Sequence, residues 1–313
     1  MLGIRLPSPA YARVRAGVYV DRSSYDALPN WQRYAVRVHA LLRAHPDVIL
    51  CLESAATVLG LPVFEEPRDL HVYDPDRTAS RRSGDVVVHT SADLRRVGQI
   101  AGIRTTSPID TVVDLVRVLP PAQGLAVADA AISPSQLAFT DVGTLRALEQ
   151  LQQNRRGRAR ARWVWSHADE RAESPGESVS RAVIGWCGFE HPELQRRFHY
   201  EGHDDRADFF FPTIGAIGES DGWGKYSLGD PEEAAEHLRD EKRREDRLRR
   251  NGHPVARWEL TDAWRVEPLV RALRAVGLRP VRPRESGMLT TLRHRPRALR
   301  RHPRATAEKS DPT

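Results

Sequence analysis

The sequence is poor in cysteine and contains no long apolar run. Of its 313 residues only Cys51 and Cys187 are cysteines, which argues against a disulfide framework and against a cysteine zinc site. No run of 18 or more apolar residues could span a bilayer, and the first residues, MLGIRLPSPAYARVRAG, lack the continuous apolar segment of a secretory signal. We therefore expect a cytoplasmic protein.

The net positive charge of the chain is confined to its end, and the rest of the chain is near neutral. The formal net charge is +6, and residues 282–313 account for it, with nine Arg or Lys against three acidic residues. This segment is rich in Pro and Arg and has few large apolar residues, so we expect a basic disordered tail. Such a tail either only increases solubility or adds attraction to phosphate that does not depend on nucleic-acid sequence.

Length and composition favour two domains of a soluble, globular type. The chain is longer than most single domains, and its 40% hydrophobic and 29% charged residues are typical of globular proteins. Composition changes near residues 155–175, from an Arg-dense segment to a polar one. We place one domain at residues 1–160 and a second at residues 170–278.

The first half shows mixed α/β patterning with little catalytic chemistry. A strand pair is predicted over residues 11–21 and a helix over residues 31–44, and two period-2 strands follow the LESAATVLGLP segment. Ser54 is a predicted N-cap of a short helix, and Ser107 with Pro108 begins another helix. The histidines of this half are interpreted as strand or surface residues and not as ligands: His39, His71 and His89.

The second half alternates helices and strands in a definite order. A helix is predicted over residues 174–189, followed by the strand-like runs LQRRFHYEG, RADFFFP and AIGESDG. A long charged helix over residues 231–251, the strand HPVARWEL and a last helix over residues 262–276 complete it. The predicted class is α/β (α+β).

Acidic residues interrupt two of these apolar strands. Asp208 precedes three phenylalanines, and Glu219 follows Ile217 with no turn that requires it. Because unpaired carboxylates are costly to desolvate, this pair favours a functional site over a surface ion pair. Asp221 with Gly222 has the alternative interpretation of a turn.

Glu177 has two possible roles. It lies three residues after Ser174, as the acidic partner of a capping box does, and in that role it would only accept the Ser174 backbone N–H. Alternatively it contributes to the site of Asp208 and Glu219. The sequence leaves both open.

The order of elements together with these acids resembles the PD-(D/E)XK, or restriction-endonuclease-like, superfamily. The branch similar to very-short-patch-repair endonucleases fits best, over residues 174–276. In the wider superfamily the second acidic motif is Glu, any residue, then Lys, whereas here Glu219 and Ser220 are followed by Asp221. The resemblance is carried by PGESVSR, HPELQRR, RADFFFP, IGESDGWGKY, EKRREDRLRRNG and PVARWEL.

This resemblance implies an αβββαβα domain that is a Mg²⁺-dependent (or Mn²⁺-dependent) DNA endonuclease or nicking enzyme of defence or repair type. Asp208 and Glu219 would ligate the metal, with the Ser220 carbonyl a possible third ligand. Glu177 would reach the ion through water or orient the nucleophile. Lys225 would stabilise the charge that develops on the phosphoryl group.

The charged helix offers further candidates. Its alternating signs, as in Asp240 with Arg244, are typical of a solvated face held by weak ion pairs, which is the favoured interpretation. In the alternative, three cations face the acidic site and a DNA backbone: Lys242, Arg243 and Arg257.

The first half resembles the abortive-infection type IV antitoxin family through RVRAGVYVD, LESAATVLGLP and TTSPIDTVVDLVRV. Members of that family couple a winged helix to a second domain and can repress transcription. Here the chain starts at the wing-like segment, so we expect most of the winged helix to be missing. The alternative function is therefore a non-catalytic DNA-binding regulator or antitoxin-like protein on a degenerate nuclease fold, with a cognate toxin or a repair protein as partner.

Overall fold

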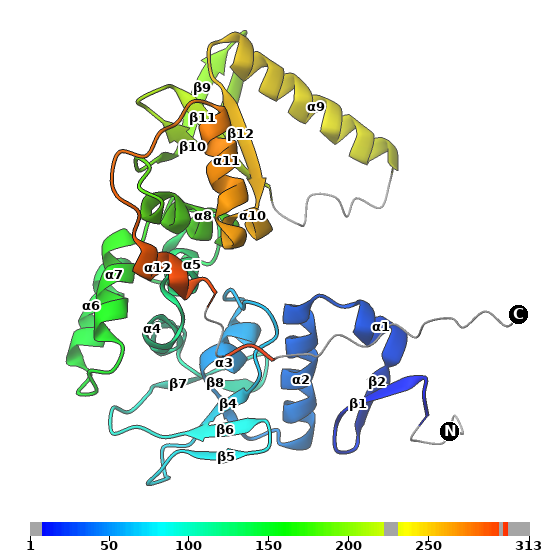
Figure 1. The fold of residues 1–313 in the computed structure, drawn as a ribbon. Helices are drawn as coiled ribbons and strands as arrows, with labels where there is room; N and C mark the ends of the chain where they lie inside the picture. The colour runs from blue at the N-terminus through cyan, green and yellow to red at the C-terminus, as the bar shows by residue number, and fades with distance from the viewer. Residues whose placement is uncertain (1–7, 222–230, 294–296, 300–313) are drawn as a thin grey trace, which may run out of the picture.

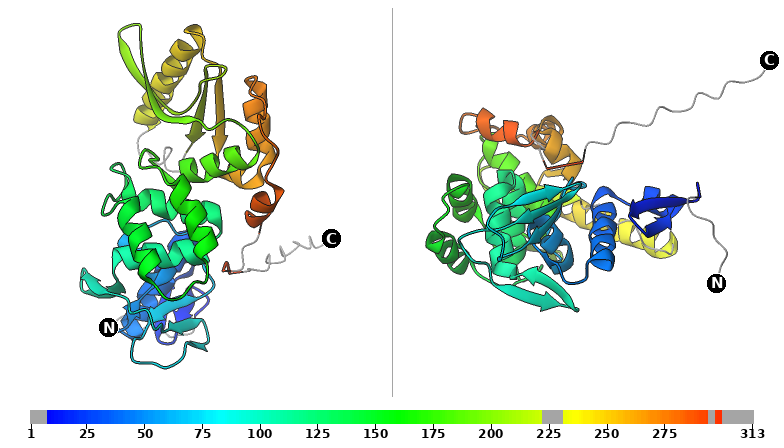
Figure 2. Two further views of the ribbon diagram at one scale, coloured as in Figure 1. Left: turned by 90° about the vertical axis from the view of Figure 1, so that its left-hand side faces the viewer. Right: turned by 90° about the horizontal axis from the view of Figure 1, so that it is seen from below.

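Two larger sheets are separated by helices, and a small two-stranded hairpin lies near the N-terminus (Figure 1). The structure is a computed structural model that describes residues 8–221, 231–293 and 297–299. Figures 1 and 2 show the two sheets at opposite ends of the ribbon, with α4 and α5 between them. The mixed α/β class expected from the sequence is confirmed at this level.

A six-stranded mixed sheet lies in the first half, in the order β5-β6-β4-β3-β8-β7. Parallel pairs join β3 to β8 and β4 to β6, and the other three pairs are antiparallel. The predicted strand pair near the N-terminus is a separate antiparallel hairpin. The strands are β1 (Tyr11–Arg15), β2 (Val18–Asp21), β3 (Ile49–Leu50), β4 (Leu70–Tyr73), β5 (Arg81–Ser83), β6 (Val86–His89), β7 (Val97–Ile100) and β8 (Ile103–Thr106).

Three helices accompany this sheet: α1 (Arg22–Ala27), α2 (Asn30–Ala44) and α3 (Leu52–Leu59). The apolar face of α2 packs on buried residues of β3 and β4. The predicted cap at Ser54 is wrong, because α3 begins earlier, after Cys51. The Ser54 hydroxyl is instead buried inside the fold, where it accepts the His71 backbone N–H at 2.8 Å. His71 itself lies on β4 but is buried, so only its strand assignment is confirmed.

A helical layer follows, formed by α4 (Pro108–Val118), α5 (Pro121–Ile132), α6 (Val142–Leu151) and α7 (Arg158–His167). Ser107 caps α4 as predicted, since its hydroxyl accepts the Asp110 backbone N–H and Pro108 occupies the first turn. Every residue of α5 except Gln123 is buried. A helix buried on all sides must lie at the centre of the packing.

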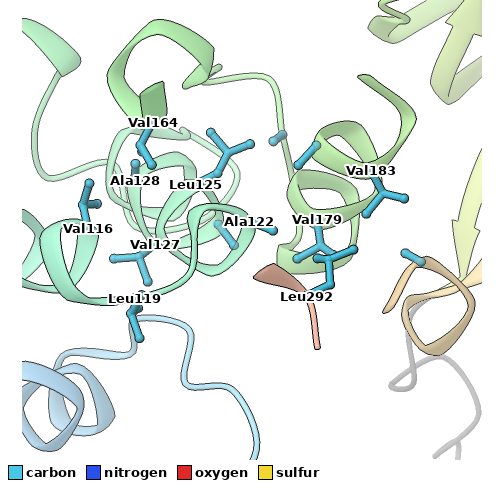
Figure 3. Close-up of a cluster of buried hydrophobic side chains, with 14 of the residues drawn as sticks. Val116, Leu119, Ala122, Leu125, Val127, Ala128, Val164, Val179, Val183 and Leu292 are labelled. Atoms are coloured by element: carbon cyan, nitrogen blue, oxygen red, sulfur yellow. The ribbon is translucent and has the colours of Figure 1, made fainter. Parts of the chain in front are cut away.

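The second half begins at α8 (Pro175–Trp186), whose apolar face packs against α5. Figure 3 shows side chains of α4, α5 and α7 together with Val179, Val183 and Leu292 in one cluster. This cluster includes residues from both predicted domains, 1–160 and 170–278. The helical layer therefore provides a shared core for both sheets.

The C-terminal sheet has the order β12-β11-β10-β9, with only β11 and β12 parallel. The predicted order of helix, three strands, helix, strand and helix is confirmed, except that Val266, with φ of 70°, divides the last helix in two. The elements are β9 (Glu193–Tyr200), β10 (His203–Phe211), β11 (Ala216–Asp221), α9 (Pro231–Arg250), β12 (Val255–Glu259), α10 (Leu260–Arg265) and α11 (Glu267–Ala275).

Part of the predicted disordered tail is folded, which corrects the expectation for residues 282–313. It contains α12 (Ser286–Thr291), and the Glu285 backbone N–H donates to the Trp186 carbonyl at 2.8 Å. Leu292 is buried in the shared core. The buried Leu292 side chain and these backbone hydrogen bonds offset the conformational entropy that is lost when this segment becomes ordered. The Arg- and Pro-rich composition had suggested that no such contacts would form. In the described part of the chain, no helix combines the length and apolar character that a membrane crossing requires.

Candidate functional site

Two strand carboxylates lie opposite each other in the C-terminal sheet. Phe209 of β10 pairs with Gly218 of β11, so one further step of this antiparallel register brings Asp208 opposite Glu219. Residues directly opposite in an antiparallel pair project from the same face of the sheet. The Ser220 backbone N–H also donates to Asp208 Oδ2 at 2.9 Å. The two acids singled out in the sequence are therefore neighbours across the strands.

Glu177 joins them from the first turn of α8. Burial raises its pKa to about 7, and the negative charge of Asp208 adds to the rise. Ser174 caps the helix by accepting the Glu177 backbone N–H at 3.2 Å. The carboxylate, however, accepts the Glu173 backbone N–H at 2.9 Å where the capping box expected Ser174. The Glu177 carboxylate therefore both binds the backbone at the start of the helix and interacts with Asp208.

Glu219 carries the same signature. It is 4% exposed, and burial followed by the charge of Asp208 raises its pKa to about 7, although Arg244 opposes the rise. The pKa values of two carboxyl groups are thus raised to about 7, first because both groups are buried and second because the charge of Asp208 lies beside them. We call Glu177, Asp208 and Glu219 the acidic cluster.

Gln195 on β9 belongs to this site and was not singled out from the sequence. It falls opposite Asp208, between the pairs Leu194–Phe209 and Arg196–Ala207. Its Nε2 donates to Glu177 Oε2 at 2.9 Å, while its buried Oε1 has no hydrogen-bond partner among the described residues. Its φ of 55° is unusual for a residue other than glycine. The signal in the sequence was the Gln of HPELQRR, a polar amide side chain within one of the segments that carry the family resemblance.

Arg244 of α9 reaches the acidic cluster. Its Nη1 donates to Glu219 Oε1 at 3.1 Å and to the Arg206 carbonyl at 2.8 Å. The helical pairing of Arg244 with Asp240 suggested by the sequence is therefore wrong, since Asp240 pairs with Arg243 at 3.2 Å. A cation on a separate helix compensates part of the buried negative charge.

Arg257 of β12 lies beside the cluster, paired in parallel register with Glu219. Its guanidinium contacts three carboxylates: Glu241, Glu245 at 3.0 Å and Asp221 at 3.4 Å. Arg257 therefore faces acidic groups as the sequence suggested, but its own charge is compensated. Asp221 is the last residue of β11 and takes part in this network.

The remaining predicted residues lie outside the cluster or outside the described residues. Lys242 and Arg243 are exposed on α9, where surface pairs such as Arg249 with Glu245 confirm the solvated-face interpretation for this stretch. Lys225 and Gly222 lie among residues 222–230, which the structure does not describe. Contacts of these cations with DNA stay predictions.

The donor set suits a hard cation in its chemistry. Mg²⁺ takes oxygen ligands, one or two of them carboxylates, and the cluster supplies Asp208, Glu219 and the unpartnered Oε1 of Gln195. Burial and the charge of Asp208 raise the pKa values of Glu177 and Glu219, so a nearby cation would stabilise their ionised forms. Among the described side chains, however, no three His, Cys, Asp or Glu are already gathered around one point as a metal would require. Binding would thus require the carboxylates to move together and Arg244 to release Glu219.

Comparison with known proteins identifies relatives without an assigned activity. No protein-family model matches the chain, and no solved structure matches it. Two uncharacterized proteins of Mycobacterium tuberculosis, from strain CDC 1551 / Oshkosh and strain ATCC 25618 / H37Rv, are similar to it. Each is 29% identical over 214 residues, which cover 68% of this chain and 74% of the relative.

Proposed function

We propose that the C-terminal part of this chain is a Mg²⁺-dependent or Mn²⁺-dependent DNA endonuclease or nicking enzyme with a restriction-endonuclease-like αβββαβα arrangement. The observation that carries the proposal is the acidic cluster. In it Asp208 and Glu219 lie opposite each other on adjacent strands, and the pKa values of Glu177 and Glu219 are raised. Strongly perturbed pKa values of this kind gather at functional sites more often than elsewhere. The order of helices and strands agrees with the proposed domain.

The residues take distinct roles in this proposal. Asp208 and Glu219 would hold the divalent ion, which when bound would supply charge neutralisation at the phosphate and activation of water. Glu177, with a pKa of about 7, is suited to accept a proton from the attacking water near neutral pH. Gln195 orients Glu177 through its Nε2 hydrogen bond. Arg244, which contacts Glu219 in the structure, would donate hydrogen bonds to a phosphate oxygen of the DNA.

A second candidate rests on the arginines. Arg244 and Arg257 pair with the acids of the site and its surroundings, so protein cations compensate part of their negative charge. This favours a DNA-binding regulator or antitoxin-like protein, with a toxin or repair partner, on a nuclease scaffold that no longer cuts. The acidic cluster would then be structural.

A plasmid-nicking assay separates the two. Wild type is expected to nick supercoiled DNA with Mg²⁺ or Mn²⁺, and Asp208→Asn to lose about 100-fold or more of this activity, because a metal contributes several kcal/mol of charge stabilisation. Asp204→Asn is the matched control: it makes the same change on the same strand, where the side chain is 87% exposed. A wild type inert on duplex, single-stranded and mismatched DNA would overturn the nuclease proposal.

A further inference from the structure

A half-buried guanidinium from the C-terminal segment packs against buried side chains of the first half of the chain. Arg297 lies 244 residues from Glu53 and donates from Nε and Nη2 to both oxygens of its carboxylate. The same Nη2 lies 3.0 Å from His71 Nε2. Glu53, on α3, and His71, on β4, are each 4% exposed. Planar, two-point contact of this kind discriminates arginine from lysine.

The walls of this pocket accept hydrogen bonds. Burial disfavours charge on Glu53, but Arg297 outweighs it and holds its pKa at about 2, so the carboxylate is ionised. Burial lowers the pKa of His71 to about 4, so its ring is neutral. His71 Nδ1 lies 2.9 Å from His89 Nε2, and in the tautomer whose Nδ1–H donates to His89, His71 Nε2 is an acceptor. The arrangement thus matches the donors of a guanidinium.

Backbone pairing accompanies the side-chain contact. The Arg68 N–H donates to the Arg297 carbonyl at 2.7 Å, and the Leu299 N–H donates to the Glu66 carbonyl at 2.7 Å. Ala298 forms an antiparallel bridge with Pro67. Residues 297–299 therefore pair with residues 66–68 through one isolated antiparallel bridge and two backbone hydrogen bonds, and such main-chain pairing also serves proteins that bind extended peptides.

The pocket is larger than the segment that fills it. A cavity of about 30 Å³ remains beside Arg297 and Ala298, and apolar residues of the first half line it, including Pro62, Phe64 and Pro120. A buried ion pair is a weak source of net stability, because desolvation offsets much of the attraction. Peptide-binding sites typically combine three features found here. These are two-point contact with an arginine, hydrogen-bond acceptors that line the pocket, and main-chain pairing with the bound segment.

We propose that the pocket around Glu53 and His71 is a binding site for arginine within an extended peptide, and that Arg297–Leu299 is its tethered ligand. The chain's own tail occupies the site in cis and exchanges with a free peptide of the same sequence. The proposal uses none of the acidic cluster, so it stands or falls independently of nuclease activity.

The test uses full-length protein and a fluorescent peptide of residues 293–303. In the Arg297→Ala protein the site is vacated, so we expect it to bind the peptide at least about tenfold more tightly than wild type, whose tethered segment competes at an effective concentration on the order of millimolar. A peptide with Arg297→Lys should bind about tenfold more weakly, because an ammonium cannot make the planar two-point contact. The double variant Glu53→Gln, Arg297→Ala should lose binding of the peptide.

Two controls make the outcome decisive. A scrambled peptide of equal charge measures non-specific attraction, and Arg250→Ala removes an exposed arginine from an ion pair with Glu201 elsewhere. The proposal would be overturned if the native and scrambled peptides bound equally well. It would also be overturned if the Arg297→Ala protein and wild type bound the native peptide equally well.

Wild type provides a second measurement if Arg297→Ala does not fold. Millimolar unlabelled peptide should accelerate hydrogen exchange at the Leu299 amide, which leaves the groove, while the Arg68 amide stays protected by the incoming peptide. Unchanged exchange at Leu299 would show that the segment is a fixed structural element.

Discussion

At the scale of single residues, the most informative groups are the buried carboxyls of the acidic cluster. Glu177 and Glu219 have folded-state pKa values of about 7, against an ordinary value of 4.5. Burial is the first cause for both, and Asp208 is the second. The folded protein therefore retains protons that the unfolded chain releases between these values.

This difference predicts how stability depends on pH. Between about pH 4.5 and pH 7 the native state binds more protons than the unfolded state, so the free energy of unfolding should fall as pH rises and level off above about pH 7. Each group contributes at most about 3 kcal/mol to this fall. Urea unfolding measured from pH 4.5 to pH 8 checks it. Glu177→Gln should lessen the slope, and a slope equal to that of wild type would contradict the assigned pKa.

Metal binding should reverse the same trend. A divalent ion competes with these protons, so Mg²⁺ should raise the melting temperature more at pH 8 than at pH 6. Asp208→Asn removes a ligand and should abolish the increase, whereas Asp204→Asn should retain it. Equal melting temperatures with and without Mg²⁺ in wild type at pH 8 would count against a metal site and favour the regulator.

At the scale of elements, β11 is packed tightly between β10 and β12. A Cβ added at Gly218 would lie 2.5 Å from Trp258 Cη2 and 3.2 Å from Phe209 Cβ. Trp258 is itself held by its Nε1–H, which donates to Ser180 Oγ of α8 at 2.8 Å. The strand that carries Glu219 is thus fixed by contacts at the preceding residue.

Gly218→Ala should consequently destabilise the protein. Overpacking of a dense interior typically costs 1–3 kcal/mol, and we expect a loss of about that size in denaturant unfolding. Gly98→Ala on β7 is the matched control, since its Cβ would meet no atom within 4 Å. If Gly218→Ala proved as stable as Gly98→Ala, the packing around Trp258 would have to be looser than the structure shows.

At the scale of the whole molecule, the contact between α5 and α8 unites the two halves. Asp129 of α5 is fully buried and accepts a hydrogen bond from Arg181 Nη2 of α8 at 2.6 Å. It also accepts the Asp169 backbone N–H at 2.9 Å. The hydrophobic cluster around this pair includes residues of both predicted domains.

Asp129→Ala should accordingly weaken the entire protein. Removing one partner of a buried pair leaves the other uncompensated and costs about 3–5 kcal/mol. Asp204→Ala, which removes the partner of an exposed pair with His199, should cost less than about 1 kcal/mol. Because the core is shared, thermal unfolding of wild type should show one transition. Two separate transitions would instead support independently folding domains.

The sequence by itself determined the local features. The order of elements in the second half follows from period-2 and helical patterning, and Ser107 and Ser174 cap helices as their sequence contexts indicate. Asp208 and Glu219 could be singled out because each interrupts an apolar strand. These features depend on residues within a few positions of one another, where propensity and periodicity act.

Only the tertiary structure decided the partners. Arg244 had an equally suitable partner one helical turn away in Asp240, yet it pairs with Glu219, 25 residues distant. Gln195 of β9 meets Glu177 of α8, and Arg297 meets Glu53 across 244 residues. Charges of opposite sign are abundant along this chain, so local sequence cannot rank them. Which pairs form depends on which surfaces the folded core brings together and removes from water, because desolvation and distance set the strength of each contact.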